Sequence, residues 1–298
     1  MKRSNPRNIE NIVKKLALDI GPRPIGKPEK LGQTRKFITA SFEDIGMKVS
    51  LQPVIYKGLE YHNVIAGPHE DPLARRRQDI LVVGAHYDTV STTPGADDNA
   101  SGIAALLEIA RILARFSLKN VVYAAFCMEE PPVFRTKKMG SYRYAKYLSQ
   151  IGQGLKGMIC LEMVGYFTDR PGSQKYPFPL MNRIYPDKGN FIAMVGNLKS
   201  RNFTFEFKEL FQKHTTVPVE SLNAPAIMIG IDFSDHWAFQ KLGYQALMVT
   251  DTAFYRNPNY HRPSDTPATL DYKKAALVVD GLAGAILDIC NRSSPCAI

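Results

Sequence analysis

The stretch DILVVGAHYD, residues 79–88, decides the fold class. Its first seven residues form an apolar run, which is typical of a strand that is covered on both faces of a parallel sheet. Residues 121–128 and 157–164 have the same character, and the segments 101–116 and 142–150 between the runs have helical spacing. Apolar strands that alternate with helices indicate βαβ units and a mostly parallel sheet.

The rest of the chain extends this pattern on both sides. Periodicity predicts helices over residues 8–19, 29–44, 203–214 and 272–290, and strands over residues 49–56, 61–66, 191–195 and 246–250. Residues 168–190 are rich in Pro, Gly and Tyr and are expected to form a long surface excursion. We therefore expect one α/β domain over residues 1–298, a mixed, mostly parallel sheet with helices on both faces.

Composition narrows the functional classes. The chain has 298 residues, of which 45% are hydrophobic and 22% charged, so it can bury a large core and is not of a disordered type. No apolar stretch is long enough for a membrane span. The net charge is +10, but apart from residues 75–77 and 137–138 the basic residues are scattered, without a nucleic-acid motif. We expect neither a membrane nor a nucleic-acid partner.

The cysteines and the N-terminal residues bear on the compartment. Cys127, Cys160, Cys290 and Cys296 form no C-x-x-C pair, and the first two lie in apolar runs. This usage predicts buried free thiols in a reducing compartment. The first residues carry no apolar run of the kind found in secretory signals. We therefore expect a cytoplasmic protein; the oligomeric state is left open.

Residues that could bind a metal or act in catalysis lie at the ends of three of the apolar runs. His86 and Asp88 follow the first, Glu129 and Glu130 follow the second, and Glu162 lies near the end of the third. The carboxyl ends of parallel strands meet at one edge of a sheet, where ligands bind. Several buried carboxylates would repel one another unless a divalent cation neutralises them. Imidazole and carboxylate ligands without thiolate suit zinc or another transition metal.

Each of these residues also has a purely structural interpretation. A histidine at a strand end is often only a hydrogen-bonded core residue. Asp88 and the run Asp97-Asp98-Asn99 could serve turns or the N-cap of the helix that starts near residue 101. The pair Glu129-Glu130 could lie in a solvated loop, and His261 could belong only to a turn. Their joint occurrence in this order favours a site.

Four segments together resemble a known family. They are HYDT (residues 86–89), GADDNASG (residues 95–102), the pair Glu129-Glu130, and YHRPSDT (residues 260–266). They are similar to the motifs of zinc exopeptidases of the bacterial leucyl aminopeptidase type, a family that also includes glutamate carboxypeptidases and glutaminyl cyclases. The match runs in order over most of the chain. It implies the zinc exopeptidase fold and a peptide substrate.

The resemblance also implies metal ligands. The ligand set would be His86, Asp98, Glu130, Glu162 and His261, holding two zinc ions, or one. Asp98 would bridge the two ions, with Glu130 and His261 on one and His86 and Glu162 on the other; spacing alone leaves the reverse pairing open. The family usually has Asp where this chain has Glu162, so the geometry of that site departs from the family pattern.

Further roles follow from the same resemblance. Glu129 would be the general base, which activates the attacking water and passes its proton to the leaving amine. Asp88 would orient a ligand histidine, and Tyr260 could donate a hydrogen bond to the oxyanion. Asp235 and His236 could position the substrate, although Asp235 or Ser234 could equally be a helix N-cap. The Asp98–Asn99 peptide bond is expected to be cis.

Three functional classes remain open. The leading hypothesis is an aminopeptidase that hydrolyses the N-terminal peptide bond. A carboxypeptidase acting on short or blocked peptides would need a cation for the substrate carboxylate, and Arg135 or the pair Lys137-Lys138 could supply it. A glutaminyl-cyclase-type acyltransferase would use nearly the same ligands with one zinc. A non-enzymatic protein with a decayed site is disfavoured, because Glu129 and all five ligands are retained.

Overall fold

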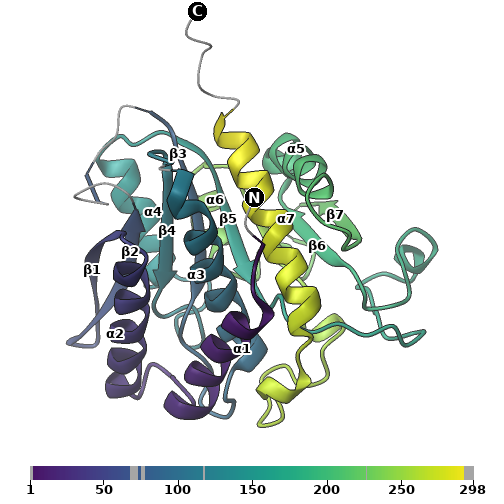
Figure 1. Cartoon of the computed structure of the whole chain (residues 1–298), viewed down its shortest axis with the longest axis horizontal. Coiled ribbons are helices and arrows are strands. Elements are labelled where there is room, and N and C mark those ends of the chain that lie inside the picture. Colours follow the sequence, from purple (N-terminus) through teal and green to yellow (C-terminus); the bar gives the residue numbers. More distant parts are fainter. Residues whose placement is uncertain (1–2, 68–72, 75–77, 117, 226, 292–298) are drawn as a thin grey trace, which may run out of the picture.

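The computed structural model describes residues 3–67, 73–74, 78–116, 118–225 and 227–291. Eight strands form one sheet (Figure 1). Their order across the sheet is β1 (Lys48–Tyr56), β2 (Leu59–Gly67), β4 (Val121–Phe126), β3 (Ile80–His86), β5 (Leu155–Glu162), β8 (Ala246–Thr250), β6 (Ile192–Gly196) and β7 (Val219–Asn223). The four parallel pairs are β3–β4, β3–β5, β5–β8 and β6–β7, and the other three pairs are antiparallel. The predicted mixed, mostly parallel sheet is confirmed.

Helices cover both faces of the sheet, as predicted. One face carries α1 (Pro6–Lys14), α2 (Pro28–Asp44), α3 (Gly102–Leu113), α5 (Arg201–Gln212) and α7 (Tyr272–Asn291), which lie in front in Figure 1. The other face carries α4 (Gly140–Gln150) and α6 (His236–Lys241). Helix α3 contacts the sheet as well as α1 and α7. Its position between these layers explains why its sequence is apolar nearly all round.

The central strand β3 shows why its sequence is a continuous apolar run. Leu81 and Val83 belong to the core under α3, whereas Ile80 and Val82 belong to the core under α4. Because successive side chains of a strand point to opposite faces, a strand between two helical layers needs apolar residues at every position. This packing holds the carboxyl end of β3, at His86, in a fixed place.

Two differences from expectation affect the pocket and the site. Strand β7 was not predicted, because its sequence VESLN has only two apolar residues and these do not alternate with polar ones; it lies at the edge of the sheet. Strand β4 ends at Phe126, two residues earlier than predicted, and Met128 has a positive φ of 61°. The chain therefore turns sharply just before Glu129, which aims this residue away from the strand direction.

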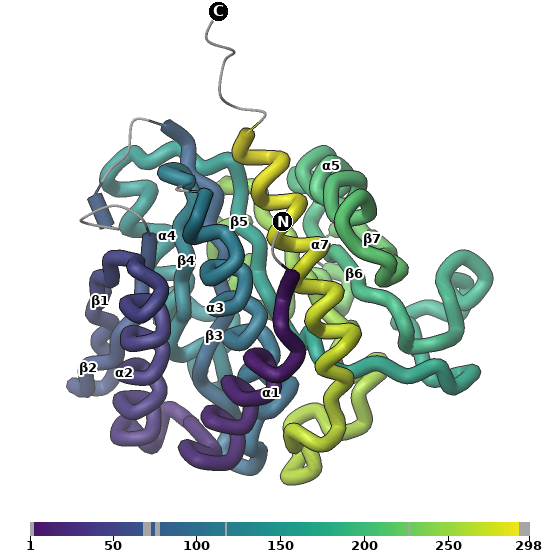
Figure 2. Tube along the Cα trace, viewed as in Figure 1, coloured from purple at the N-terminus to yellow at the C-terminus, as the bar shows by residue number. Residues whose placement is uncertain are grey.

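Residues 168–190 form the expected excursion between β5 and β6. Their only helical turn is the 3₁₀ segment Pro179–Arg183, and the loop projects at the right of Figure 2. Among the described residues, no helix combines the length and apolarity needed to cross a bilayer. Cys127, Cys160 and Cys290 are buried and free, as predicted. Cys296 and the basic run 75–77 lie outside the described residues.

Candidate functional site

The sheet delivers side chains from three strands to one edge. His86 is the last residue of β3 and Glu162 is the last residue of β5, while Glu129 and Glu130 follow β4. These strands are parallel neighbours, so their carboxyl ends lie together. Two further segments complete the group: the π-helical segment Ala96–Ser101 before α3 provides Asp98, and the turn before α7 provides His261.

These residues form two groups that share Asp98. In the first group, His86 Nε2 lies 3.5 Å from Asp98 Oδ1 and 3.2 Å from Glu162 Oε2. In the second, His261 Nε2 lies 3.1 Å from Asp98 Oδ2 and 3.4 Å from Glu130 Oε2. The two carboxylate oxygens of Asp98 therefore face different histidines, which is the arrangement of a bridging ligand. Of the two pairings considered, the structure brings together His86 with Glu162 and Glu130 with His261.

The geometry of both groups fits a zinc ion. Ligands bound tetrahedrally at 2.0–2.1 Å are about 3.3 Å apart, and each group provides three donors whose atoms lie within 4.8 Å of one another. Glu130 Oε1 is buried and has no hydrogen-bond partner among the described residues. Burial, reinforced by repulsion from Asp98, raises the pKa of Glu130 to about 7. A bound cation would supply the missing partner and offset both effects.

Asp88 contacts two parts of the site, the imidazole of His86 and the backbone of Glu129 and Glu130. The backbone carbonyl oxygen of Asp88 lies 3.2 Å from His86 Nδ1, and the side-chain Oδ1 of Asp88 lies 3.5 Å from the same nitrogen. The Asp88 carboxylate also accepts hydrogen bonds from the backbone N–H groups of Glu129, at 2.9 Å, and Glu130, at 3.0 Å. One buried carboxylate thus orients the imidazole of His86, leaving Nε2 free for a metal, and fixes the Glu129–Glu130 backbone.

Glu129 lies where a general base is needed. Its Oε2 is 3.9 Å from His86 Nε2, and the residue is buried. Burial raises the pKa of Glu129 well above the ordinary range, opposed by His86 and reinforced by Glu130 and Glu162. A carboxyl group whose proton affinity is raised in this way is suited to taking up a proton and releasing it again.

Glu162 is held by a hydrogen-bonded chain that its sequence context did not reveal. The hydroxyl of Ser234 donates to Glu162 Oε2 at 2.6 Å, and Cys160 Sγ lies 3.1 Å from Ser234 Oγ. Burial raises the pKa of the Cys160 thiol, so the thiol keeps its proton and donates to Ser234. The longer side chain at position 162 is thereby fixed toward His86.

Asp265 is a second residue whose role was not predicted. Its carboxylate accepts hydrogen bonds from the backbone N–H groups of Asp97, at 2.9 Å, and Asp98, at 3.2 Å. The Asp98–Asn99 peptide bond is cis, as predicted. The signal for Asp265 was its position in the segment YHRPSDT, which also carries His261. The segment therefore links one metal-binding candidate to the backbone of another.

Tyr260 stacks on the neighbouring imidazole. The rings of Tyr260 and His261 are 3.8 Å apart with an interplanar angle of 18°. Burial, assisted by the negative charge of Asp98, raises the pKa of Tyr260. The phenol therefore stays protonated and remains a hydrogen-bond donor beside the metal-binding candidates.

Asp235 and His236 are fully buried and do not line the pocket next to the site. His236 Nε2 donates to the carbonyl of Ile231 at 2.7 Å, and burial lowers the pKa of His236 to about 4, so its ring is neutral. Asp235 precedes the first residue of α6, but its side chain makes no capping hydrogen bond. Both side chains are enclosed by the protein and neither lines the pocket, so their role in positioning the substrate stays a prediction.

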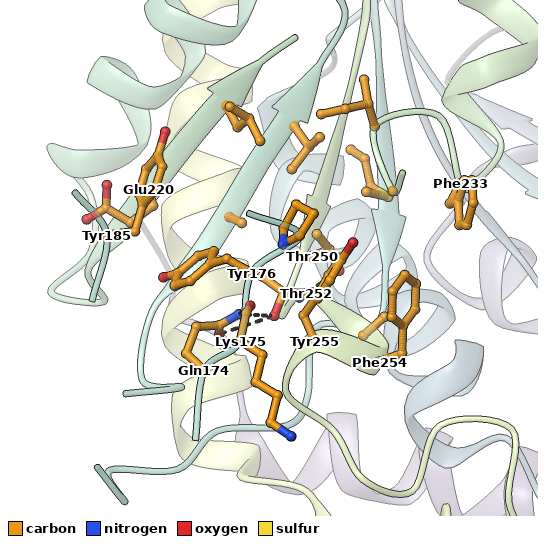
Figure 3. A pocket seen from close by; sticks show the side chains of 18 of the residues that line it. Gln174, Lys175, Tyr176, Tyr185, Glu220, Phe233, Thr250, Thr252, Phe254 and Tyr255 are labelled. Atoms are coloured by element: carbon orange, nitrogen blue, oxygen red, sulfur yellow. Dashed lines mark hydrogen bonds between the residues drawn. The ribbon is translucent and has the colours of Figure 1, made fainter. Parts of the chain in front are cut away.

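A pocket opens beside Glu162 and Tyr260 (Figure 3). The space inside it is about 830 Å³, including the part open to solvent. Strand register places Glu162, Thr250, Ala193 and Glu220 in one row across β5, β8, β6 and β7, and all four line the pocket. The floor of the pocket thus leads from Glu162 toward the edge of the sheet.

The excursion 168–190 forms one wall of this pocket. Gln174, Tyr176 and Tyr185 line it, and Figure 3 shows them on the side opposite Phe233. The guanidinium of Arg256 fixes the excursion, because its Nε donates to Gln174 Oε1 at 2.8 Å and its Nη1 donates to a backbone carbonyl at the start of β6. The excursion therefore limits the size of the pocket.

Comparison with known proteins identifies relatives of the chain. It is 40% identical over 292 residues to "Uncharacterized protein YfbL" of Escherichia coli (strain K12), covering 94% of this chain and 87% of that protein. It is 25% identical over 229 residues to leucine aminopeptidase 1 of Trichophyton rubrum, covering 71% of this chain and 53% of that protein. The chain thus matches about half the length of this fungal relative.

A solved structure shares the fold. The zinc aminopeptidase BSAP from Bacillus subtilis superimposes with a TM-score of 0.73 at 16% identity, covering 96% of this chain and 95% of that chain. A family model described as Peptidase family M28 matches residues 63–286. That segment contains every candidate metal-binding residue and Glu129, which the structure brings to one edge of the sheet. The chain therefore belongs to peptidase family M28.

Proposed function

We propose that this protein is a zinc-dependent aminopeptidase with two metal ions in the groups His86–Asp98–Glu162 and Asp98–Glu130–His261. The observation that carries the proposal is that one oxygen of the Asp98 carboxylate faces His86 and the other faces His261, with Glu129 beside His86. Membership of the M28 family and the similarity to a leucine aminopeptidase support it.

The residues of the site then have distinct tasks. Bound zinc would polarise the scissile carbonyl and make water more acidic. Glu129 takes the proton of the attacking water and delivers it to the leaving amine. The phenol of Tyr260 donates a hydrogen bond to the oxyanion that develops on the carbonyl oxygen. Asp88 keeps the imidazole of His86 and the backbone of Glu129 in place during these transfers.

The charge of the site favours a substrate with a free amine. Six carboxyl groups gather here, those of Asp88, Asp98, Glu129, Glu130, Glu162 and Asp235. Burial raises the pKa of Glu129, Glu130 and Asp235, so the six are not all charged together, but the surroundings are acidic and attract an ammonium group more than a carboxylate. This balance favours aminopeptidase over carboxypeptidase chemistry at the metals. The side chain of the N-terminal residue would enter the pocket beside Glu162.

The buried free thiols agree with the cytoplasmic location that we propose for the protein.

Activity and metal content can be tested together on purified protein. We expect about two zinc ions per chain, hydrolysis of leucine p-nitroanilide, and no hydrolysis of N-acetylated dipeptides. Hydrolysis of only the acetylated peptides would refute the aminopeptidase assignment. One zinc per chain with cyclisation of N-terminal glutamine would indicate a glutaminyl-cyclase-type enzyme instead.

A further inference from the structure

Arg135 occupies an unusual position next to the pocket. It lies in the loop between β4 and α4, five residues after Glu130, and its backbone has a positive φ of 53°. Two successive turns keep this loop compact, since the N–H of Val133 bonds to the carbonyl of Glu130 and the N–H of Thr136 bonds to the carbonyl of Val133. A non-glycine residue in this backbone region is uncommon and persists where its surroundings hold it.

A buried carboxylate holds the guanidinium of Arg135. Its Nη2 donates to Asp232 Oδ2 at 2.7 Å, and the side chain of Asp232 is 2% exposed whereas that of Arg135 is 40% exposed. The other oxygen of Asp232 is buried without a hydrogen-bond partner among the described residues. The pair therefore joins a fixed acid inside the protein to a cation that faces solvent. No other side-chain hydrogen bond of this guanidinium is present in the described part of the chain, so its outer N–H groups remain available.

Aromatic rings connect this guanidinium to the metal-binding candidates. The guanidinium lies 5.7 Å from the ring of Phe233, which is 6.3 Å from Phe254, and Phe254 is 5.6 Å from Tyr260. Phe233 and Phe254 line one end of the pocket in Figure 3. Each residue of an extended peptide adds about 3.5 Å. The three steps span at most about 18 Å, so a peptide that extends up to about five residues beyond the scissile bond reaches from Tyr260 to Arg135.

We propose that Arg135 binds the free carboxylate of a short peptide substrate, so that the enzyme acts on short peptides. This inference rests on the proposed aminopeptidase function. A guanidinium presents a planar fork of donors that matches a carboxylate, and Asp232 occupies only one edge of the fork. The carboxylate could be the C-terminus of the peptide or the side chain of an acidic residue after the scissile bond.

Peptides and their amides separate the two sources of a carboxylate. The probes are leucine followed by one to five glycines, the C-terminal amide of each of these peptides, and Leu-Asp amide. We expect kcat/KM for a free peptide to exceed that for its amide about tenfold or more, mainly through KM. In Arg135→Met this ratio should approach one, and in Arg135→Lys, which keeps the charge without the fork, it should be intermediate. If Leu-Asp amide is hydrolysed with a higher kcat/KM than the other amides while the free peptides show no advantage over their amides, the side-chain carboxylate is the ligand.

Lys138→Met is the matched control. It removes one positive charge from the same loop, but the ammonium of Lys138 lies over the ring of Tyr56, 5.2 Å from its centroid, whereas Arg135 lies over Phe233, which lines the pocket. The peptide-to-amide ratio should therefore be unchanged in this variant. An unchanged ratio in Arg135→Met, with an unaltered melting temperature, would refute the inference.

Binding without turnover makes the result independent of the catalytic proposal. Zinc-loaded Glu129→Gln protein, with and without Arg135→Met, would be titrated calorimetrically with each peptide of the glycine series and with its amide. Tighter binding of a free peptide than of its amide that disappears in Arg135→Met supports the carboxylate site even if the wild type hydrolyses no peptide. If the wild type hydrolyses peptide and amide equally well and both bind equally, the inference fails while the aminopeptidase proposal stands.

Discussion

Replacing Ser234 with alanine should weaken zinc binding in one group of ligands only. The hydroxyl of Ser234 donates to Glu162 Oε2 at 2.6 Å, and Ser234 and Glu162 are both buried. A hydrogen bond to a charged group contributes about 1.5–3 kcal/mol. Its loss releases Glu162 from the orientation that faces His86, which should weaken zinc binding there about 10- to 100-fold.

The second group provides an internal reference for this experiment. Among the described residues, no hydrogen bond or ion pair joins Ser234 to Glu130 or His261, so zinc affinity at that group should be almost unchanged. Metal-free protein would be titrated with zinc in competition with a chromophoric chelator, which resolves two dissociation constants. Ser41→Ala, which removes a hydroxyl bonded to a backbone carbonyl within α2, controls for a general effect of the substitution.

Two results would refute this reasoning. Equal weakening of both dissociation constants would show that Ser234 supports the fold around the whole site rather than Glu162. Unchanged affinity in both groups would show that packing alone orients Glu162. Cobalt substitution adds a second readout, because the visible absorption of the ion in the His86 group should change while that of the other ion should not.

Three other substitutions or conditions test the remaining assignments. Glu129→Gln should lower turnover roughly 10²- to 10⁴-fold at unchanged zinc content, and persistent activity would show that another residue is the base. The melting temperature of metal-free protein should fall as pH rises from about 5 to 9. Added zinc should raise the melting temperature more at high pH than at low pH. The reason is that the folded state raises the pKa of His261 from 6.5 to about 10 and that of Glu130 from 4.5 to about 7. Protonated His261 thus stabilises the folded state below pH 6.5, and this stabilisation is lost toward pH 10. Ionisation of Glu130 lowers the stability of the folded state between pH 4.5 and 7. A melting temperature that rises with pH would contradict this reasoning. Arg256→Met should raise KM several-fold for bulky substrates with little change in kcat, since Gln174 loses the donor that fixes the pocket wall; equal loss for small and bulky substrates would contradict it.

Local sequence determined much of the architecture. The runs that became β3, β4 and β5 are apolar at nearly every position, because helices cover both sides of these strands. Their carboxyl ends must lie together once the strands are parallel, so His86, Glu129 and Glu162 could be placed at one edge of the sheet before any coordinates. The edge strand β7 escaped prediction, because an edge strand needs fewer apolar residues.

The sequence by itself determined which residue types meet, and the tertiary structure decided how they are held. The pairing of His86 with Glu162 and of His261 with Glu130 depends on which oxygen of Asp98 each imidazole faces, a matter of a few ångströms. The supports of the site come from segments more than 70 residues away, such as Ser234 for Glu162 and Asp265 for the Asp98 backbone. Spacing along a chain carries no information about such contacts, because packing of the whole sheet and its helices brings the segments together.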